Sequence, residues 1–293
     1  MHRCFTLLLL LVALMAAGQK GKKSNKNESQ KQGQIVSWLS RYNLRDPHAK
    51  QFHLPKQLSE ASGLTMSADG RLFSHNDELG IVYQIDYTTG KIVKQFSLGT
   101  ITLRGDFEGI AMNGGMMYLV ASNGNIYEFK EGKDGERVSY EVYKTFLTEH
   151  NNVEGLEYDN ETDCLLLACK GDAGRGYDGY KAVYAFSLKK MKLERIPRLL
   201  IPLKIVSKKA HEGKFNPSGI ARHPKSGTYF IISANGRSII EMSTDGVVLD
   251  QEEIPNRLNK QPEGITFAPD LTMIICDDAQ GGNGMLTLYH LEP

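Results

Sequence analysis

The chain has 293 residues, of which 41% are hydrophobic, and its formal net charge is +1. It is long enough to bury a sizeable core as one large domain or two smaller ones. A charge so close to zero gives no overall attraction for nucleic acid or acidic substrates, so we expect no nucleic-acid partner.

Residues 1–18 have the layout of a secretory signal peptide, with His2 and Arg3 before an apolar run and small residues near Gly18. The apolar run, residues 5–17, is short for a helix that spans a bilayer, which takes about 20 residues. We therefore predict export. The alternative is that the signal segment is not cleaved and that residues 5–17 anchor the protein in the membrane. Residues 19–37 are polar and rich in lysine, and predict a disordered linker before a domain of residues 38–293.

A serine or glutamate followed by glycine recurs five times in that domain. The five segments are "EASGLTMSADG", "RGDFEGIAM", "NVEGLEYD", "NPSGIARHPKSG" and "QPEGITFAPD". The glycines are Gly63, Gly109, Gly155, Gly219 and Gly264, at intervals of 46, 46, 64 and 45 residues. A period of about 45 residues is typical of a propeller blade of four short strands. We predict an all-β, five-bladed β-propeller, with six blades as the alternative.

The repeat units divide into predicted strands in chain order. The first two blades comprise residues 62–67, 71–77, 81–87 and 91–98, then 107–112, 116–122, 125–130 and 138–147. The third and fourth comprise residues 153–159, 164–170, 182–188 and 198–206, then 218–223, 228–234, 238–243 and 247–254. The fifth has only residues 263–268, 272–278 and 285–291. Because an unpaired edge strand invites aggregation, we expect the segment "AKQFHLP" (residues 49–55) to complete the fifth blade and close the ring.

The cysteines of the domain are predicted to be unpaired. Cys164 and Cys169 stand five residues apart in "CLLLAC", which places them on opposite faces of a strand and about 16 Å apart, too far for a disulfide. Their spacing fits no zinc pattern. We expect them to be buried small apolar residues.

The residue before each repeated glycine should reach an equivalent position on the central channel, because the first strand of each blade lines it. Those residues are Ser62, Glu108, Glu154, Ser218 and Glu263. Converging carboxylates repel one another, so a proton, a cation or a basic group must compensate them. Oxygen ligands in a ring suit Ca²⁺, and we predict a Ca²⁺ site formed by these five residues. Two alternatives stay open: simple packing and capping, or neutralisation by Arg104 or Lys170.

Polar residues also cluster where the second strand of each blade ends, which predicts a polar rim at one end of the channel. Most are ordinary turn formers, so turn chemistry alone is the alternative. The candidates for ligand binding are His75, Asp77, Asn123, Asp172, Asn235, Asp277 and Asp278.

Several of these segments resemble the SdiA-regulated (YjiK-like) proteins: the D-F-E-G-I pattern, the opening "EASGL…SHNDELGIVYQID" and the unit "PSGIARHPKSGTYFIISANG". The resemblance runs over residues 35–293. It implies a five-bladed propeller, exported or tethered to a membrane, with a calcium site and no established enzymatic activity. The family pattern carries over to Glu108, Glu154 and Glu263, whereas Ser62 and Ser218 depart from it. More distantly, the chain resembles NHL-repeat and lactonase-type propellers.

We therefore expect an exported, periplasmic or envelope-associated monomer that binds Ca²⁺ and an unidentified small molecule or envelope protein, without catalysis. The alternative is a hydrolase of the lactonase or phosphoesterase type, in which a channel Ca²⁺ acts with Asp77, His75 or Asp277 as base. The sequence has no G-x-S-x-G elbow and no zinc-protease helix to support it. A third hypothesis is a scaffold whose carboxylate ring is neutralised internally.

Overall fold

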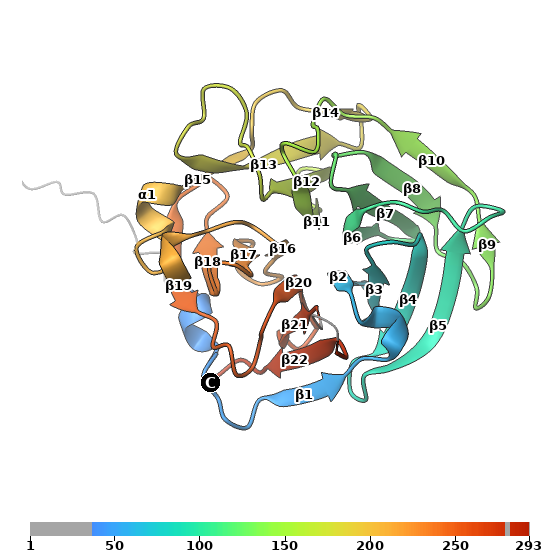
Figure 1. The fold of residues 1–293 in the computed structure, drawn as a ribbon, viewed down its shortest axis with the longest axis horizontal. Helices are drawn as coiled ribbons and strands as arrows, with labels where there is room; N and C mark the ends of the chain where they lie inside the picture. The colour runs from blue at the N-terminus through green and yellow to red at the C-terminus, as the bar shows by residue number, and fades with distance from the viewer. Residues whose placement is uncertain (1–36, 279–281, 293) are drawn as a thin grey trace, which may run out of the picture. The chain divides into compact units, whose positions relative to one another are not determined.

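The computed structural model describes residues 37–278 and 282–292. Five sheets of mainly antiparallel strands surround a central axis, and Figure 1 looks down that axis. The predicted five-bladed β-propeller is confirmed, and the six-bladed alternative is wrong. The predicted signal peptide lies outside the described residues, as does the linker except for Ser37. No helix in the described ranges is long and apolar enough to cross a membrane.

The innermost strand of each blade is the one that carries a repeated glycine. These strands are β2 (Ala61–Met66), β6 (Phe107–Asn113), β11 (Val153–Asp159), β16 (Gly219–Arg222) and β20 (Pro262–Phe267). The next strands outward are β3 (Leu72–Asn76), β7 (Met116–Ala121), β12 (Cys164–Cys169), β17 (Tyr229–Ser233) and β21 (Met273–Asp277). Third in each blade come β4 (Ile81–Asp86), β8 (Ile126–Lys130), β13 (Tyr180–Ser187), β18 (Ser238–Met242) and β22 (Met285–Tyr289).

The outer edges of the blades are less regular. β5 (Lys91–Leu98), β10 (Tyr140–Tyr143) and β19 (Val248–Glu253) complete blades 1, 2 and 4. In blade 3, β14 (Lys192–Leu193) and β15 (Leu199–Pro202) both pair with β13. Short helical turns occur at η1 (Leu39–Arg41), η2 (Lys56–Leu58), α1 (Leu203–Val206) and η3 (His211–Gly213).

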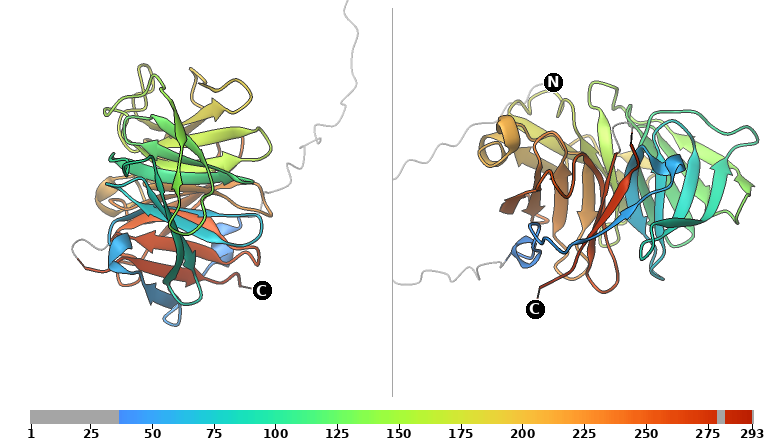
Figure 2. Two further views of the ribbon diagram at one scale, coloured as in Figure 1. Left: turned by 90° about the vertical axis from the view of Figure 1, so that its right-hand side faces the viewer. Right: turned by 60° about the horizontal axis from the view of Figure 1, so that its bottom comes forward.

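The ring is closed by β1 (Lys50–His53), which pairs with β22 as the outermost strand of blade 5. The register runs from Lys50 opposite Leu288 to His53 opposite Met285. Figure 1 shows this blue strand from the start of the domain beside the red strand from its end, and Figure 2 shows the ring from two other directions. The predicted closure is confirmed.

Two predicted outer strands differ from the structure. The segment at residues 138–147 is divided, because β9 (Arg137–Val138) crosses over and pairs in parallel with β5 of blade 1. The segment at residues 198–206 ends as a strand at Pro202, after which α1 begins. Proline has no N–H to donate, so it suits the start of a helix better than the interior of a sheet.

Close approach at the five glycines packs the blades together near the axis. A Cβ atom on Gly109 would lie only 2.8 Å from the backbone nitrogen of Leu156 in the next blade. On Gly264 it would lie 2.9 Å from the backbone nitrogen of Leu64, so the same contact closes the circle between the last blade and the first. No side chain fits there, and the repeated glycine is required by space.

Apolar side chains fill each junction between neighbouring blades. In one such cluster, Leu64 of blade 1 packs with Ile274 and Leu286 of blade 5. Cys164, Cys169 and Cys276 are buried and unpaired, as predicted.

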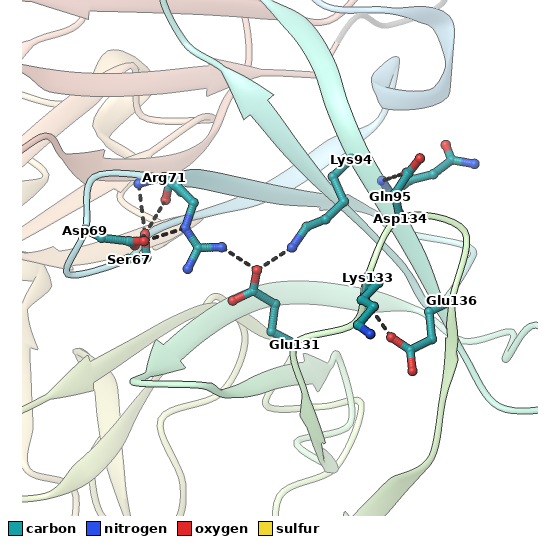
Figure 3. A network of polar contacts seen from close by, with 9 residues as sticks. All are labelled: Ser67, Asp69, Arg71, Lys94, Gln95, Glu131, Lys133, Asp134 and Glu136. Atoms are coloured by element: carbon teal, nitrogen blue, oxygen red, sulfur yellow. Dashed lines mark hydrogen bonds and ion pairs between the residues drawn. The ribbon is translucent and has the colours of Figure 1, made fainter.

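A polar network reinforces the junction of blades 1 and 2 (Figure 3). Arg71 and Lys94 of blade 1 both form ion pairs with Glu131, which follows β8 of blade 2. Asp69 holds the Arg71 guanidinium from the other side at 2.8 Å. Asp134, in the loop after Glu131, accepts a 2.9 Å hydrogen bond from the backbone nitrogen of Gln95. The loop that leads to β9 is thus fixed to blade 1.

Candidate cation site at the channel mouth

The residue before each repeated glycine lies at a bulge in the innermost strand. Pairing of β6 with β7 shifts register between Phe107 and Gly109, so Glu108 is the extra residue. Strands β2, β11 and β20 shift register in the same way around Ser62, Glu154 and Glu263. A bulge bends its strand and redirects the extra side chain. The repeated pair is therefore the sequence signal of a bulge, although it was predicted as an ordinary strand start.

Four of the five predicted metal ligands line one small cavity at the start of the inner strands: Ser62, Glu108, Glu154 and Glu263. The space open to the centre of a water-sized sphere is about 10 Å³. That is room for a single water molecule or ion.

Ser218, the fifth predicted ligand, has a different place. Its hydroxyl donates to the backbone oxygen of Pro262 at 2.7 Å and accepts from the backbone nitrogen of Ala234 at 3.1 Å. The side chain is 1% exposed. Ser218 therefore links the backbones of blades 4 and 5, and it does not line the cavity formed by the other four residues.

Lys170, at the end of β12, reaches into the carboxylate ring. Its Nζ lies 3.0 Å from Oε1 of Glu154, which is buried. Asn152 donates a second hydrogen bond of 2.8 Å to the same oxygen. Of the two basic residues that the sequence offered for neutralisation, Lys170 forms this pair, whereas Arg104 is exposed.

The carboxyl groups of the ring hold their protons unusually tightly. Burial, together with the charges of Glu154, Asp106 and Glu263, raises the pKa of Glu108 well above its ordinary value. Burial and the charge of Glu154 raise the pKa of Glu263 to about 8. Burial also raises the pKa of Glu154, although Lys170 opposes that shift. Glu108 and Glu263 thus both respond to the charge of Glu154, with which they line one cavity.

Burial lowers the pKa of Lys170, but the charges of Glu154, Glu263 and Glu108 outweigh it, and the net pKa lies above its ordinary value. Lys170 is therefore a cation at neutral pH. One ammonium group faces three carboxyl groups, so the rest of the negative charge must be compensated by protons or by a bound cation.

The donor set agrees in part with a calcium site. Carboxylate and hydroxyl oxygens are the ligands that Ca²⁺ prefers. Within the part of the chain that the structure describes, however, no group of three or more His, Cys, Asp or Glu side chains is arranged to hold a metal ion. The ion pair between Lys170 and Glu154 engages one of the three carboxylates. Glu108, Glu263 and Ser62 are the other oxygen-bearing residues that line the cavity.

Sequence reasoning missed a further set of polar residues, each two positions before the residue that precedes a repeated glycine. In blade 5, Gln261 donates to Oε1 of Glu263 at 2.9 Å and to Asp278 at 3.2 Å. Asn152 holds the equivalent position beside Glu154. The alignment on the repeated glycine contains the signal, because every blade has an oxygen-bearing side chain here: Glu60, Asp106, Asn152, Asn216 and Gln261.

Two predicted rim residues are inside the protein. His75 is 0% exposed, and its Nδ1 lies 2.9 Å from the carbonyl oxygen of Asn76. Burial lowers the pKa of His75 to about 4, so its imidazole group is neutral. Asp277 accepts hydrogen bonds from Asn259 at 2.6 Å and from the backbone nitrogen of Gln261 at 2.9 Å. These positions end buried β-strands and face blade junctions, so neither residue belongs to an exposed rim.

Asp77 and Asp278 lie just past the second strands of blades 1 and 5, beside the mouth. Burial and the nearby charge of Glu60 raise the pKa of Asp77 to about 6. Its Oδ1 is buried and has no hydrogen-bond partner among the described residues. Asp278 is partly buried and contacts Gln261. These two residues are the predicted rim carboxylates that the structure places next to the ring.

The remaining rim candidates lie in turns. Asn123 accepts a 3.1 Å hydrogen bond from the backbone of Asn125, and Asp172 accepts one of 2.7 Å from Gly174. Asn235 is exposed in the turn between β17 and β18. The contacts of Asn123 and Asp172 are those of turn-forming residues.

Comparison with known proteins gives a likeness of fold. No protein-family model matches the sequence, and no curated protein matches it significantly. A solved structure of a luciferin-regenerating enzyme is 14% identical, with a TM-score of 0.52, and the match covers 83% of this chain and 95% of the other. Glutaminyl cyclase from Myxococcus xanthus is also 14% identical, with a TM-score of 0.53 and coverage of 83% and 94%. Identities this low show the fold alone, and the chain is accordingly a β-propeller.

Proposed function

We propose that this chain is an exported ligand-binding β-propeller of the cell envelope whose channel mouth binds a cation, with Ca²⁺ as the ion. The observation that carries the proposal is the charge of the ring. Glu108, Glu154 and Glu263 line one cavity, and Lys170 supplies one positive charge against them. The resemblance to SdiA-regulated proteins and the signal-peptide pattern support the same assignment.

Glu108 and Glu263 would hold the ion, with the Ser62 hydroxyl as a further oxygen. When bound, Ca²⁺ would neutralise these carboxylates and offer open coordination positions to oxygen atoms of a ligand. Lys170 and Asn152 keep Glu154 in place at the side of the site. Asp77 and Asp278, beside the mouth, are positioned to contact the ligand. We expect a monomer that binds an unidentified small molecule or envelope protein.

The variant Lys170→Met distinguishes two hypotheses: that a bound cation compensates the carboxylate ring, or that Lys170 alone neutralises it. Removal of the ammonium group leaves Glu154 without its ion-pair partner, so the melting temperature of the metal-free protein should fall. Millimolar Ca²⁺ should restore it, because the ion can then compensate all three carboxylates. At 100 times the dissociation constant, a ligand adds about 2.7 kcal/mol to the free energy of unfolding. Each kcal/mol corresponds to roughly 2–4 °C in a domain of this size.

Lys94→Met is the matched control, because Lys94 also pairs with a glutamate but lies at the junction of blades 1 and 2. Its melting temperature should fall, and Ca²⁺ should raise it only as much as it raises that of the unmodified protein, without restoring the loss. If Lys170→Met and the unmodified protein are both insensitive to Ca²⁺ by melting and by titration calorimetry, the ring is neutralised internally and the cation site is refuted.

A second candidate function, a Ca²⁺-dependent hydrolase, rests on Asp77. A carboxyl with a pKa of about 6 is largely ionised at neutral pH and suits a general base. The two similar solved structures are enzymes by name. Hydrolysis of a model lactone that is lost in Asp77→Asn, while Ca²⁺ binding persists, would establish this function. Absence of hydrolysis at saturating Ca²⁺ would leave binding as the function.

A further inference from the structure

A second cavity, of about 440 Å³, lies at the opposite end of the channel. The inner strands all begin at the carboxylate mouth, and this cavity is lined by the residues at their other ends, such as Met66, Met112 and Phe267. Small-molecule pockets in proteins commonly measure roughly 300–1,000 Å³. The cavity is therefore large enough for a small ligand, in contrast to the space at the mouth.

The five-fold repeat builds this cavity in two layers. Two residues after each glycine stand Thr65, Ala111, Glu157, Ala221 and Thr266, and the polar three of these line the cavity. Three residues after each glycine stand Met66, Met112, Tyr158, Arg222 and Phe267, all of which line it. The residues three positions after the glycines thus supply adaptable methionines and aromatic rings. The residues two positions after the glycines supply two hydroxyls and one carboxyl group.

Arg222, the basic residue among the described residues that line the cavity, is already compensated. The Nη2 of Arg222 pairs with Glu161 at 2.7 Å, and Nη1 donates to Asn160 at 3.0 Å. Its Nε lies 3.4 Å from the carboxylate of Asp159, which is 1% exposed. A ligand with a strong negative charge would therefore have to displace existing ion pairs.

The carboxyl group in the wall, that of Glu157, is mostly protonated at neutral pH. Burial raises the pKa of Glu157 to about 8, with a smaller contribution from Asp159 and an opposing one from Arg222. The Glu157 side chain accepts a 3.0 Å hydrogen bond from the backbone nitrogen of Arg222. As a protonated acid it can both donate and accept hydrogen bonds, like the hydroxyls of Thr65 and Thr266.

We propose that this cavity is a second binding site, which takes a small uncharged molecule with a flat apolar body and a carboxamide-like group. The apolar body would lie against Met66, Met112, Tyr158 and Phe267. The carboxamide would exchange hydrogen bonds with Glu157, Thr65 and Thr266. This site is independent of the cation site at the mouth.

The test uses 2-naphthamide and its cationic isostere 2-naphthamidine, titrated into the full protein and followed by ligand-observed NMR at pH 7. The amide should bind more tightly at pH 7, and its advantage should shrink as the pH rises, because the amidinium can pair with Glu157 only after that carboxyl has lost its proton. Thr266→Val keeps the shape but removes a hydroxyl, and should weaken amide binding about fivefold. Thr272→Val is the matched control, since Thr272 is buried in the same blade but does not line the cavity.

The pH profile provides a second readout. Above pH 8, Glu157 ionises and can no longer donate, so amide binding should weaken in the unmodified protein. Glu157→Gln always has donor hydrogens, and its amide binding should stay constant between pH 6 and 9. The charged groups that act on Glu157 are Arg222 and Asp159, and Arg222 is ion-paired with both Asp159 and Glu161.

Three results would overturn the proposal. They are no binding of either probe at millimolar concentration, tighter binding of the amidinium, and amide binding that neither Thr266→Val nor pH alters. Melting curves of each variant establish that a lost signal does not reflect unfolding.

Discussion

The glutamates at the channel mouth occupy bulge positions, and this determines both where they point and how they ionise. An extra residue in the strand cannot follow the regular alternation, so the side chains of Glu108 and Glu263 line the cavity on the axis. Burial there disfavours the charged form. The same local irregularity thus explains the position of these carboxyl groups and their raised pKa values.

These raised pKa values predict that the metal-free protein loses stability as the pH rises. The unfolded chain releases the Glu108 and Glu263 protons near pH 4–5, whereas the folded chain retains them, for Glu263 to about pH 8. The folded state therefore binds more protons between these values, and the free energy of unfolding falls with pH. The slope is at most about 1.4 kcal/mol per pH unit for each proton.

The effect should be measured by urea unfolding in EDTA between pH 7.5 and 8.5, where His75 and His223 are almost entirely neutral in both states, because an unfolded histidine has a pKa of about 6.5. Their pKa values, lowered to about 4 by burial, act in the opposite direction only at lower pH. Glu108→Gln has one proton fewer to release and should show a shallower slope. A slope in the variant equal to that of the unmodified protein would show that Glu108 is ionised in the folded state.

At the scale of single elements, the inner strands depend on one residue each. Every repeated glycine faces backbone of the adjacent blade, so the blades come closer at the axis than side chains would permit. The aliphatic residue that follows each glycine is buried in a junction: Leu64, Ile110, Leu156, Ile220 and Ile265. Glycine and a large apolar residue in succession thus give each inner strand a contact surface for both neighbouring blades.

Gly109→Ala tests this contact. Its Cβ would lie 2.8 Å from backbone and side-chain atoms of Leu156, so the two blades would have to separate. Overpacking of this kind costs about 1–3 kcal/mol, to be measured as a lower midpoint in urea. Gly115→Ala is the matched control in the same blade, because a Cβ there meets no atom within 4 Å. It should be neutral or stabilising by up to about 1 kcal/mol. Equal midpoints for the two variants would contradict the proposed role of the repeated glycine.

At the scale of the whole molecule, the segment before blade 1 fastens the ring. β1 adds to blade 5, and the preceding residues are attached to blade 4 by Glu241, which is 0% exposed. Its Oε2 accepts hydrogen bonds from the backbone nitrogens of Trp38 and Leu39 at 2.7 and 2.9 Å, and Ser37 adds a third at 2.7 Å. One carboxylate thus joins residues more than 200 positions apart in the sequence.

Glu241→Gln should therefore weaken the closure. The amide oxygen would be a weaker acceptor for these three donors than the charged carboxylate oxygen, because hydrogen bonds to ionised groups are roughly twice as strong as neutral ones. We expect the free energy of unfolding to fall by about 2–4 kcal/mol in urea. Glu253→Gln serves as control, since Glu253 of the same blade pairs with Arg45 of the same segment but both are exposed. Exposed pairs contribute about 0–1 kcal/mol. A similar loss in both variants would mean that burial of the contact is unimportant.

The sequence by itself determined the number of blades, the strand that closes the ring and four of the five residues that were predicted to line the channel. These predictions depend on the spacing of the repeated glycine and on one strand-like segment that no blade used. Both features can be recognised from the order of residues along the chain alone. The period also placed Glu108, Glu154 and Glu263 in one ring, and the cavity that they line agrees with that prediction.

Only the tertiary structure decided which groups surround these residues. Lys170, and not Arg104, reaches the ring, because the end of β12 lies beside the start of β11 whereas Arg104 stands outside the mouth. His75 and Asp277 are buried because blade junctions cover them, and Ser218 is turned to the backbone of the next blade. The cavity around Glu157 is likewise formed by five separate blades. Contacts of this kind depend on distances between blades, which sequence spacing does not contain.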